Sequence, residues 1–299
     1  MEQVLRSYLE YICGKDNVAE NVLLATKTTF RIGGPARWFV IVPTKEALMR
    51  LISTLNYIEQ PWFIIGAGAN LLASDNGYNG VVIKLGFKDI IDNGCFIYAD
   101  AGANLKRLCN FAREQSLSGL EFASGIPGTV GGAVYMNAGA HGGQISDVVA
   151  MADVLVNGEV KTLDARQLAF DYRKSVFHKK PGWIILGAYF YLKKTDKSEI
   201  VLKEQAFLAQ RQQSQPTSPS AGSVFKRPSP DFAVGKALDE LGLKGTRTGG
   251  ACISDKHAGF IVNTGGATCD DVMRLIKLAR KKVKQKYDLY LQTEIQILK

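Results

Sequence analysis

The stretch Gly119 to Asp147 is the part of the chain best suited to chemistry, because it combines many glycines with few bulky side chains. Glycine has no Cβ, so its backbone adopts positive φ and comes close to other groups. In the run Ser124 to Thr129 the N–H groups are therefore accessible, and successive N–H groups in such turns form concavities that hold phosphates. The segment Tyr135 to Asn137 adds an apolar surface and an amide. This combination suits a ligand with a diphosphate and a flat ring, and it predicts turns here rather than an ordinary core helix or strand.

A second glycine loop, Gly66 to Leu72, lies upstream after a predicted strand at residues 62–65. It is similar to a dinucleotide-binding fingerprint, but Leu71 stands where that fingerprint has its third glycine. Turn residues and a strand at 81–83 follow it, where the fingerprint requires a helix. We therefore expect phosphate binding by loop N–H groups and not by a helix N-terminus. Two such loops favour a cofactor site over the ordinary alternative, a set of tight turns in a β-rich domain.

The elements that must position these loops follow an α+β pattern throughout. The segment Gln215 to Phe225 is rich in proline and serine, and it predicts a linker or a substrate loop before the last domain. A helix from Asp270 to about Lys286 begins at Thr268, with Asp271 three residues on as its capping partner. Pro43-Thr44 caps a further predicted helix, whose apolar residues from Leu48 to Leu55 have helical spacing. The other helices that we expect cover residues 1–20, 105–112, 200–213 and 233–241, and the other strands cover 38–42, 96–100, 149–156, 159–162, 183–192, 259–263 and 291–298.

The chain of 299 residues is long enough for two or three domains, and its formal net charge of +9 calls for an anionic partner. Nucleic acid is one candidate and anionic small molecules such as nucleotides and diphosphates are the other. The densest basic run, Arg280 to Lys286, falls at the end of the predicted helix, where cations complement the helix dipole. No aromatic residues alternate with these lysines, so we interpret the run as a solvated helix end and not as a nucleic-acid platform.

The cysteine pattern argues against a disulfide-rich protein and against a zinc-binding protein. The cysteines are odd in number and scattered (Cys13, Cys95, Cys109, Cys252 and Cys269), and no C-x-x-C pair occurs among them. A disulfide framework or a structural zinc site is not expected, and a reducing cytoplasm is the natural location. The N-terminus shows no export signal, no stretch is apolar enough for a membrane helix, and no metal site is predicted.

Over nearly its whole length the chain resembles the UDP-N-acetylenolpyruvoylglucosamine reductase family, the flavoenzymes of peptidoglycan precursor synthesis. The resemblance rests on motifs that are weak singly and specific in this order. They are Thr28 to Ala36 (TTFRIGGPA), Gly66 to Leu72 (GAGANLL), Ser124 to Gly143, Tyr172 to Ser175 (YRKS), Ser220 to Phe225 (SAGSVF), Gly249 to Asn263, and Glu294 in the predicted last strand.

The resemblance implies an α+β fold with an FAD-binding domain of the PCMH (vanillyl-alcohol-oxidase) type in two lobes, followed by a C-terminal α+β substrate-binding domain. We place the N-terminal helix and first lobe at residues 1–82, the second lobe at 83–199 and the substrate domain at 200–299, with the last strand free to return to the lobes. It also implies reduction by NADPH, through FAD, of the enolpyruvyl ether of a UDP-sugar to UDP-N-acetylmuramate. We expect a cytoplasmic monomer that binds no nucleic acid and no membrane.

The family's catalytic trio carries over onto Arg173, Ser223 and Glu294. Arg173 would stabilise the charge that spreads into the substrate carboxylate, and Ser223 would protonate the other carbon with help from Lys226 or Arg227. Glu294 would share the charge only if protonated, so we predict a raised pKa for it. Each residue alone also fits a structural role. Arg173 fits a surface ion pair, Ser223 fits a turn residue beside Gly222, and Glu294 fits an exposed position on an edge strand.

The remaining site residues are assigned with the same resemblance. His141 and His257 lie in glycine-rich loops, and for them a structural role and a ligand contact both stay open. For the substrate we name Tyr172, Arg173, Lys226 and Asn263. For the cofactor we name residues of the two glycine loops: Gly66, Ala67, Gly68, Ala69, Asn70, Leu71, Gly125, Ile126, Pro127, Gly128, Thr129, Gly132, Ala133, Asn137, Gly139 and Ala140.

One departure from the longer form of the family is visible. That form carries an insertion with a tyrosine between the Tyr-Arg-x-Ser motif and the catalytic serine, whereas Lys193 to Gln215 contains no tyrosine here. The chain therefore resembles the shorter form, and Gln215 to Phe225 is the candidate to cover the substrate. Two other functions stay open at this point, namely an alcohol oxidase of the same flavin fold and a non-enzymatic protein that binds nucleic acid or nucleotide sugars.

Overall fold

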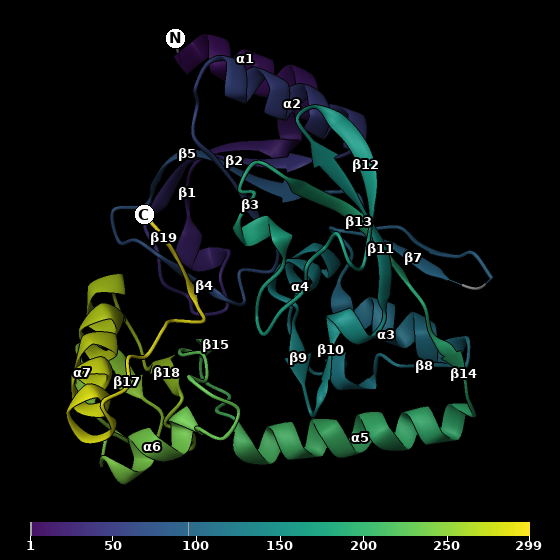
Figure 1. Cartoon of the computed structure of the whole chain (residues 1–299). Coiled ribbons are helices and arrows are strands. Elements are labelled where there is room, and N and C mark those ends of the chain that lie inside the picture. Colours follow the sequence, from purple (N-terminus) through teal and green to yellow (C-terminus); the bar gives the residue numbers. More distant parts are fainter. Residues whose placement is uncertain (1, 95) are drawn as a thin grey trace. The chain divides into compact units, whose positions relative to one another are not determined.

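The structure is a computed structural model that describes residues 2–94 and 96–299, so Cys95 lies outside the described residues. The chain divides into two compact units, each built from segments that are distant in sequence (Figure 1). Three of the five boundaries between the units fall within strands, β1 (Val18–Leu23), β2 (Pro35–Val42) and β5 (Tyr78–Leu85). The other two fall between Gly66 and Ala67 and within the helix α5 (Lys197–Ser214). Unit 1 comprises Met1–Ala19, Phe39–Gly66 and Gly80–Arg211, and unit 2 comprises Glu20–Trp38, Ala67–Asn79 and Gln212–Lys299.

An antiparallel sheet in the order β12-β11-β13-β7-β6 forms the centre of unit 1. The inner strand β13 is buried along nearly its whole length, which is typical of a strand covered on both faces. Its residue Ile185 lies opposite Val154 of β11, and Tyr189 lies opposite Tyr98 of β7. The strands of this sheet are β6 (Ile90–Asp92), β7 (Ile97–Asp100), β11 (Val149–Val156), β12 (Glu159–Asp164) and β13 (Ile184–Phe190).

Further helices and strands complete unit 1. The prediction of a helix over residues 1–20 was too long, because Gly14 turns the chain with a φ of 87° and β1 follows. Thr44 caps α2 as predicted, and its side chain accepts from the Ala47 N–H. In unit 1, β3 runs parallel to β5. The elements are α1 (Glu2–Cys13), α2 (Lys45–Tyr57), α3 (Leu105–Glu114), α5 (Lys197–Ser214), β3 (Trp62–Ile65), β8 (Leu117–Ser118), β9 (Gly139–Ala140), β10 (Gly143–Gln144) and β14 (Lys193–Lys194).

The glycine-rich stretch contains one helix that the sequence argument did not expect, α4 (Val130–Met136). It begins where the Thr129 side chain accepts from the Gly132 N–H at 3.3 Å, and it ends at Asn137 in the left-handed conformation. A Cβ on Gly131 would lie 2.8 Å from the Ala101 Cβ, so glycine lets the helix pack directly on the chain after β7. Close tertiary packing therefore overrides the low helix propensity of glycine.

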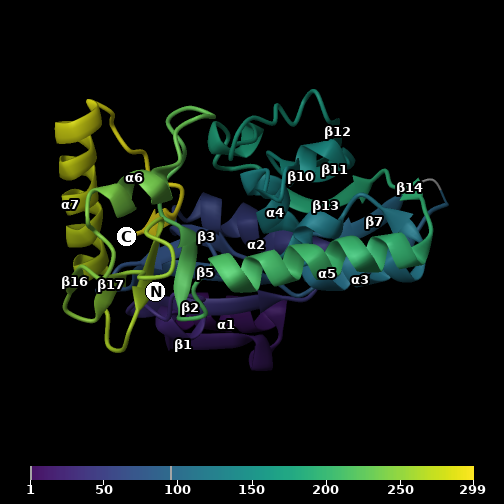
Figure 2. The ribbon, with the colours of Figure 1, turned by 90° about the horizontal axis from the view of Figure 1, so that it is seen from below.

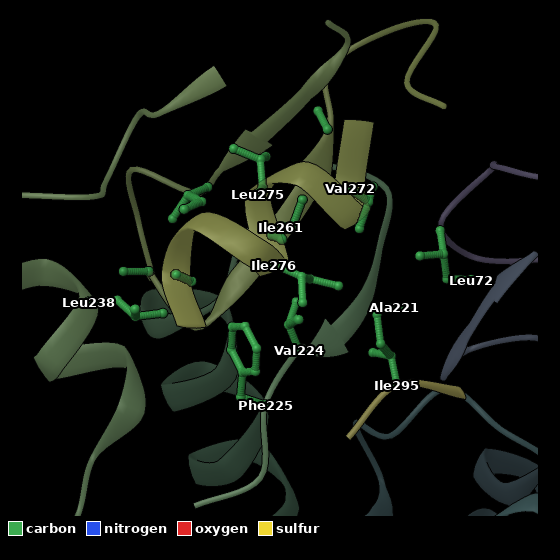
Figure 3. Close-up of a cluster of buried hydrophobic side chains, with 14 of the residues drawn as sticks. Leu72, Ala221, Val224, Phe225, Leu238, Ile261, Val272, Leu275, Ile276 and Ile295 are labelled. Atoms are coloured by element: carbon green, nitrogen blue, oxygen red, sulfur yellow. The ribbon is translucent and has the colours of Figure 1, made fainter. Parts of the chain in front are cut away.

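Unit 2 contains a second antiparallel sheet, in the order β15-β18-β17-β16, and the long helix α7. The predicted capping box is confirmed, because the side chains of Thr268 and Asp271 each accept from the other's backbone N–H. In Figure 3, Leu275 and Ile276 of α7 lie in one apolar cluster with Val224 and Phe225. The elements are β4 (Leu71–Ala73), β15 (Ser220–Ser223), α6 (Val234–Glu240), β16 (Arg247–Thr248), β17 (Ala251–Ile253), β18 (Phe260–Asn263), α7 (Cys269–Tyr287) and β19 (Gln296–Leu298).

Two predictions for the C-terminal part need correction. The last strand is shorter than the expected 291–298, because only Gln296–Leu298 pair with β4, in parallel. Glu294 therefore lies in a bend just before β19 and not within a strand. The proline- and serine-rich segment is not loop throughout, since Ser220–Ser223 form β15 and pair with β18 through an irregular register.

Two segments that are distant in sequence from the C-terminal part complete the core of unit 2. Phe30 and Ile32 come from the segment Glu20–Trp38, Leu72 comes from Ala67–Asn79, and all three are buried in the cluster around α7. Each fully buried side chain of this size stabilises the fold by about 1.5–3 kcal/mol relative to its exposed state. The core of this unit consequently depends on residues that stand far from its C-terminal sheet in sequence.

Candidate active site

The upstream glycine loop is held at both ends and presents its N–H groups between them. A Cβ on Gly66 would lie 2.6 Å from the Thr129 Oγ1, and a Cβ on Gly68 would lie 2.4 Å from the Lys27 carbonyl oxygen. Among the described residues, no protein acceptor takes a hydrogen bond from the N–H groups of residues 67–70. The chain then continues into the strand β4, so this loop offers consecutive free N–H groups without a helix, as predicted.

The downstream glycine loop offers a similar cradle in unit 1. Ile126 and Val130 donate their N–H groups to Ala123 and Ala103, which fixes the loop on both sides. Between them, the N–H groups of Gly128 and Thr129 have no acceptor in the part of the chain that the structure describes. A Cβ on Gly128 would meet no atom within 4 Å, so space lies beside these donors. Such donors beside open space fit a phosphate group.

Arg173 is held against the same glycine-rich segment. Its guanidinium donates to the carbonyl oxygen of Gly139 at 2.6 Å and to that of Asn137 at 3.4 Å, and it lies 5.3 Å from the centre of the Tyr172 ring. The backbone of Arg173 has a φ of 53°, in the left-handed region that few side chains adopt. Backbone strain of this kind is found at functional loops, and the surrounding contacts must hold it in place.

Asn137 supports the Arg173 loop through its buried side chain. Its Nδ2 donates to the carbonyl oxygen of Asp171 at 3.1 Å and to the Gln144 Oε1 at 3.3 Å. Its Oδ1 accepts from the Ser146 N–H at 2.9 Å. Ser175, which ends the Tyr-Arg-x-Ser motif, donates its hydroxyl to the Tyr135 carbonyl oxygen at 2.6 Å. These contacts tie the loop to the end of α4, so the amide that we assigned to the cofactor braces the arginine.

In unit 2 the structure brings Ser223 and Glu294 onto neighbouring backbone segments. The Glu294 N–H donates to the carbonyl oxygen of Val224 at 2.8 Å, and the next pair along, Lys226 N–H to the Gln292 carbonyl, measures 2.9 Å. The Asn70 side chain donates to the Glu294 carbonyl oxygen at 3.1 Å. The glycine loop therefore positions the backbone of Glu294, and both residues are half-buried.

Asn263 uses its side chain within the protein. Its Nδ2 donates to the carbonyl oxygens of Phe30 and Arg31, each at 3.2 Å, and its Oδ1 accepts from the N–H groups of Gly265 and Ala267. Arg31 has a φ of 56°, so Asn263 stabilises a strained turn in the Thr-Phe-Arg-Ile-Gly-Gly-Pro segment. Asn263 therefore stabilises this turn, in addition to the substrate contact that we predict for it.

The two histidines that were left open have structural contacts. The His257 ring packs against Gly235 and Gly259 and accepts from the Gly259 N–H at 3.0 Å, and burial lowers the pKa of its imidazole. The His141 ring stacks on Phe207 of α5, with 4.5 Å between ring centres and an interplanar angle of 12°. Both contacts order loops, and the second one fixes α5 against the β9-β10 hairpin.

Sequence reasoning missed Arg211, which lies near the end of α5 on the downstream glycine loop. The sequence pattern of α5 is only weakly amphipathic, so it did not indicate that Arg211 faces Gly125. The described residues contain no group of histidine, cysteine and carboxylate side chains arranged to hold a metal ion. None of the described helices is both long and apolar enough to cross a membrane.

Comparison with known families fits this geometry. Residues 36–164 match the family model for an FAD binding domain. Residues 213–298 match the model for the C-terminal domain of UDP-N-acetylenolpyruvoylglucosamine reductase. Together with the two glycine cradles, these matches define an FAD-dependent oxidoreductase whose PCMH-type FAD-binding domain is followed by a separate C-terminal domain.

Relatives along the whole chain make the assignment specific. The chain is 48% identical over 271 residues to the UDP-N-acetylenolpyruvoylglucosamine reductase of Pseudothermotoga lettingae, which covers 90% of this chain and 94% of the relative. It is 42% identical over 301 residues to that of Caldanaerobacter subterraneus subsp. tengcongensis, over 100% and 99% of the two chains. The crystal structure of the reductase from Thermus caldophilus superposes with a TM-score of 0.82 at 37% identity, over 94% and 98% of the chains. The chain belongs to the UDP-N-acetylenolpyruvoylglucosamine reductase family, as its motifs predict.

Proposed function

We propose that this chain reduces the enolpyruvyl ether of UDP-N-acetyl-3-O-(1-carboxyvinyl)-glucosamine to UDP-N-acetylmuramate, in peptidoglycan precursor synthesis, with NADPH as reductant. The observation that carries the proposal is the similarity to reductases of this family over nearly the full chain. Three side chains carry the reaction in this proposal: Arg173, Ser223 and Glu294. We also propose that residues 1–82 and 83–199 form the two FAD-binding lobes and that residues 200–299 form the substrate-binding domain.

FAD fits the two glycine cradles, because both present unpaired N–H groups and one has open space beside it. The loop from Gly66 to Leu71 and the residues Gly125 to Thr129 would hold its phosphates, with Gly132, Ala133, Asn137, Gly139 and Ala140 alongside. When bound, FAD supplies hydride transfer between NADPH and the substrate double bond. The chain itself must bind the nucleotides, hold the substrate carboxylate and deliver a proton.

Arg173 and Glu294 act on charge in this proposal. Addition of hydride to the terminal carbon of the enolpyruvyl group leaves negative charge that spreads into the adjacent carboxylate. The planar guanidinium of Arg173 forms paired hydrogen bonds with such a carboxylate and stabilises the charge. Glu294 would repel that charge as a bare carboxylate, so the raised pKa stays a prediction for it.

Ser223 delivers the proton to the remaining carbon in this proposal. A hydroxyl is a weak acid in water, so its proton transfer depends on neighbours that stabilise the developing alkoxide. The side chain of Lys226 is the nearby cation in sequence, and its backbone is fixed by the bond to Gln292. Tyr172, Lys226 and Asn263 are the residues we propose for contact with the substrate.

The alanine variant of Gly128 tests the downstream cradle. Because a Cβ there meets no atom within 4 Å and the residue needs no positive φ, Gly128→Ala is expected to fold with unchanged thermal stability as apoprotein. If the loop holds FAD, the added methyl group occupies the cofactor's space and lowers FAD affinity about tenfold or more. Titration of apoprotein with FAD measures this, and Gly182→Ala, also in open space, is the matched control. Equal FAD affinity in both variants would remove the downstream loop from the cofactor site.

The reaction itself is tested with purified holoenzyme under anaerobic conditions. Oxidation of NADPH beyond one equivalent per enzyme is expected only when the enolpyruvyl UDP-sugar is present, with UDP-N-acetylmuramate as product. NADPH oxidation that needs oxygen and ignores the sugar would favour an oxidase, and a purified protein without flavin would favour a binding protein.

A cytoplasmic location and a monomeric state complete the proposal. The four described cysteines are buried and free, which is compatible with a reducing compartment. Size-exclusion chromatography with light scattering measures the oligomeric state directly.

A further inference from the structure

Arg211 presents a charged group with no protein partner beside the downstream glycine loop. Among the described residues, its guanidinium forms no hydrogen bond, no ion pair and no aromatic contact. Burial lowers the pKa of the guanidinium, because no neighbouring carboxylate offsets the loss of water. A guanidinium carries five donors, and leaving them unpaired in a partly buried place costs free energy. Such a residue is better explained by a ligand than by the fold.

The side chain of Arg211 lies flat on the glycine loop. A Cβ on Gly125 would lie 3.0 Å from the Arg211 Cδ and 3.8 Å from its Nε, and 3.3 Å from the Leu208 Cδ2. A side chain at position 125 would therefore crowd the arginine, which would have to shift by a small distance. Three residues further along the loop, Gly128 and Thr129 offer the unpaired N–H groups described above. The arginine and these donors all belong to unit 1 and contribute charge of the same sign.

The helix that carries Arg211 is fixed along its length. At its start, Lys197 pairs with Glu114, and near its middle Glu204 pairs with Arg113 of α3 at 2.7 Å. Both views of the ribbon show α5 as one long, uninterrupted helix (Figure 1, Figure 2). Near its end, the His141 Nδ1 lies 2.9 Å from the Gln210 Oε1, one residue before Arg211. The backbone of Arg211 is therefore held in place, so only its side chain has to be ordered when a ligand binds.

The neighbouring carboxylates are committed elsewhere. Glu121, which precedes the loop, accepts from the Ser118 hydroxyl at 2.6 Å and from the Gly119 N–H at 2.8 Å. Glu204 on the same helix is occupied by Arg113, and its side chain is only 7% exposed. Neither of these two carboxylates is therefore available to pair with Arg211.

We propose that Arg211 is an anion-binding residue that clamps a phosphate of a nucleotide diphosphate against the Gly125–Thr129 loop. The inference rests on the proposed function, because FAD, NADPH and the UDP-sugar are the nucleotide diphosphates of that reaction. Arginine is suited to the task, since its planar fork forms paired, charge-assisted hydrogen bonds with phosphate.

The test compares Arg211→Gln with Lys203→Gln, which removes an exposed charge from the same helix. Apoprotein is titrated with FAD, and holoprotein is titrated with UDP and with NADP⁺ by calorimetry. Arg211→Gln is expected to weaken one of these ligands about 10- to 100-fold, the range of a charge-assisted hydrogen bond, and Lys203→Gln to weaken none. The ligand that loses affinity identifies the phosphate. Arg211→Lys should recover only part of the affinity, because an ammonium cannot form the paired contact.

A structural role is separated by the stability of the ligand-free protein. Since Arg211 has no protein partner to lose, Arg211→Gln is expected to leave the apoprotein melting temperature unchanged or higher. Unchanged affinity for all three ligands, or a lower melting temperature with unchanged affinity, overturns the inference. If the wild-type protein binds neither FAD nor UDP, the proposed function fails instead, so the two failures are distinguishable.

Discussion

Replacement of Ser223 by alanine is expected to lower turnover of the enolpyruvyl sugar about 10²- to 10⁴-fold, the usual contribution of a positioned proton donor. The affinity for the UDP-sugar should stay close to that of the wild type, because the variant removes one hydroxyl and keeps the strand. The β15 backbone continues into Val224, whose carbonyl holds Glu294, and no side chain takes part in that bond. Steady-state kinetics together with calorimetric titration of the sugar measures both quantities.

Ser220 provides the control for this experiment, because it lies on the same strand and pairs with Val262 in the same sheet. Ser220→Ala should change turnover little. A Ser223→Ala enzyme with nearly wild-type turnover would exclude Ser223 as the proton donor. Loss of sugar binding in that variant would instead indicate a structural role for the hydroxyl.

Replacement of Arg173 by lysine is expected to lower kcat/KM about 10²- to 10³-fold, although the charge is retained. This is the usual effect of removing one donor that stabilises charge in the transition state. The guanidinium reaches the carbonyl oxygens of Gly139 and Asn137, and a lysine cannot keep these bonds while it pairs with a carboxylate. The loss should fall mainly on kcat, because the charge to be stabilised is greatest in the transition state.

The adjacent Lys174 supplies the matched control, since it is exposed and contributes only its backbone to the turn with Asp171. Lys174→Gln should leave both kinetic constants close to those of the wild type. The Arg173 proposal is contradicted if Arg173→Lys keeps wild-type kcat, or if it raises KM alone.

Local signals in the sequence predicted the elements whose ends depend on neighbouring residues. Thr44 and Thr268 cap α2 and α7 as expected, because a capping side chain reaches only three residues along the chain. The helix α4 escaped this reasoning because its stability comes from packing of Gly131 on Ala101, a contact outside the local sequence. The length of the last strand was wrong for a similar reason, since only three of its residues find a partner in β4.

The candidate site could be predicted from motifs only as a set of residues, without their supports. The bond from Asn263 to Phe30 joins residues that are 233 positions apart, and the bond from Asn70 to Glu294 joins residues 224 apart. No periodicity or spacing argument reaches over such distances. Arg211 remained hidden for the same reason, because its significance comes from the glycine beneath it and from the absence of a partner in the described structure.

The interleaved order of the two units has a consequence for synthesis of the chain on the ribosome. Phe30, Ile32 and Leu72 emerge early, yet their core partners on α7 lie beyond residue 268. These apolar side chains cannot be buried against α7 until almost the whole polypeptide has been made. Contacts between residues so far apart in sequence also form slowly. A nascent chain that stops near residue 211 carries the material of unit 1 together with two orphaned segments of unit 2. Exposed apolar segments of this kind are what chaperones bind, so this fold depends on protection during translation more than its size suggests.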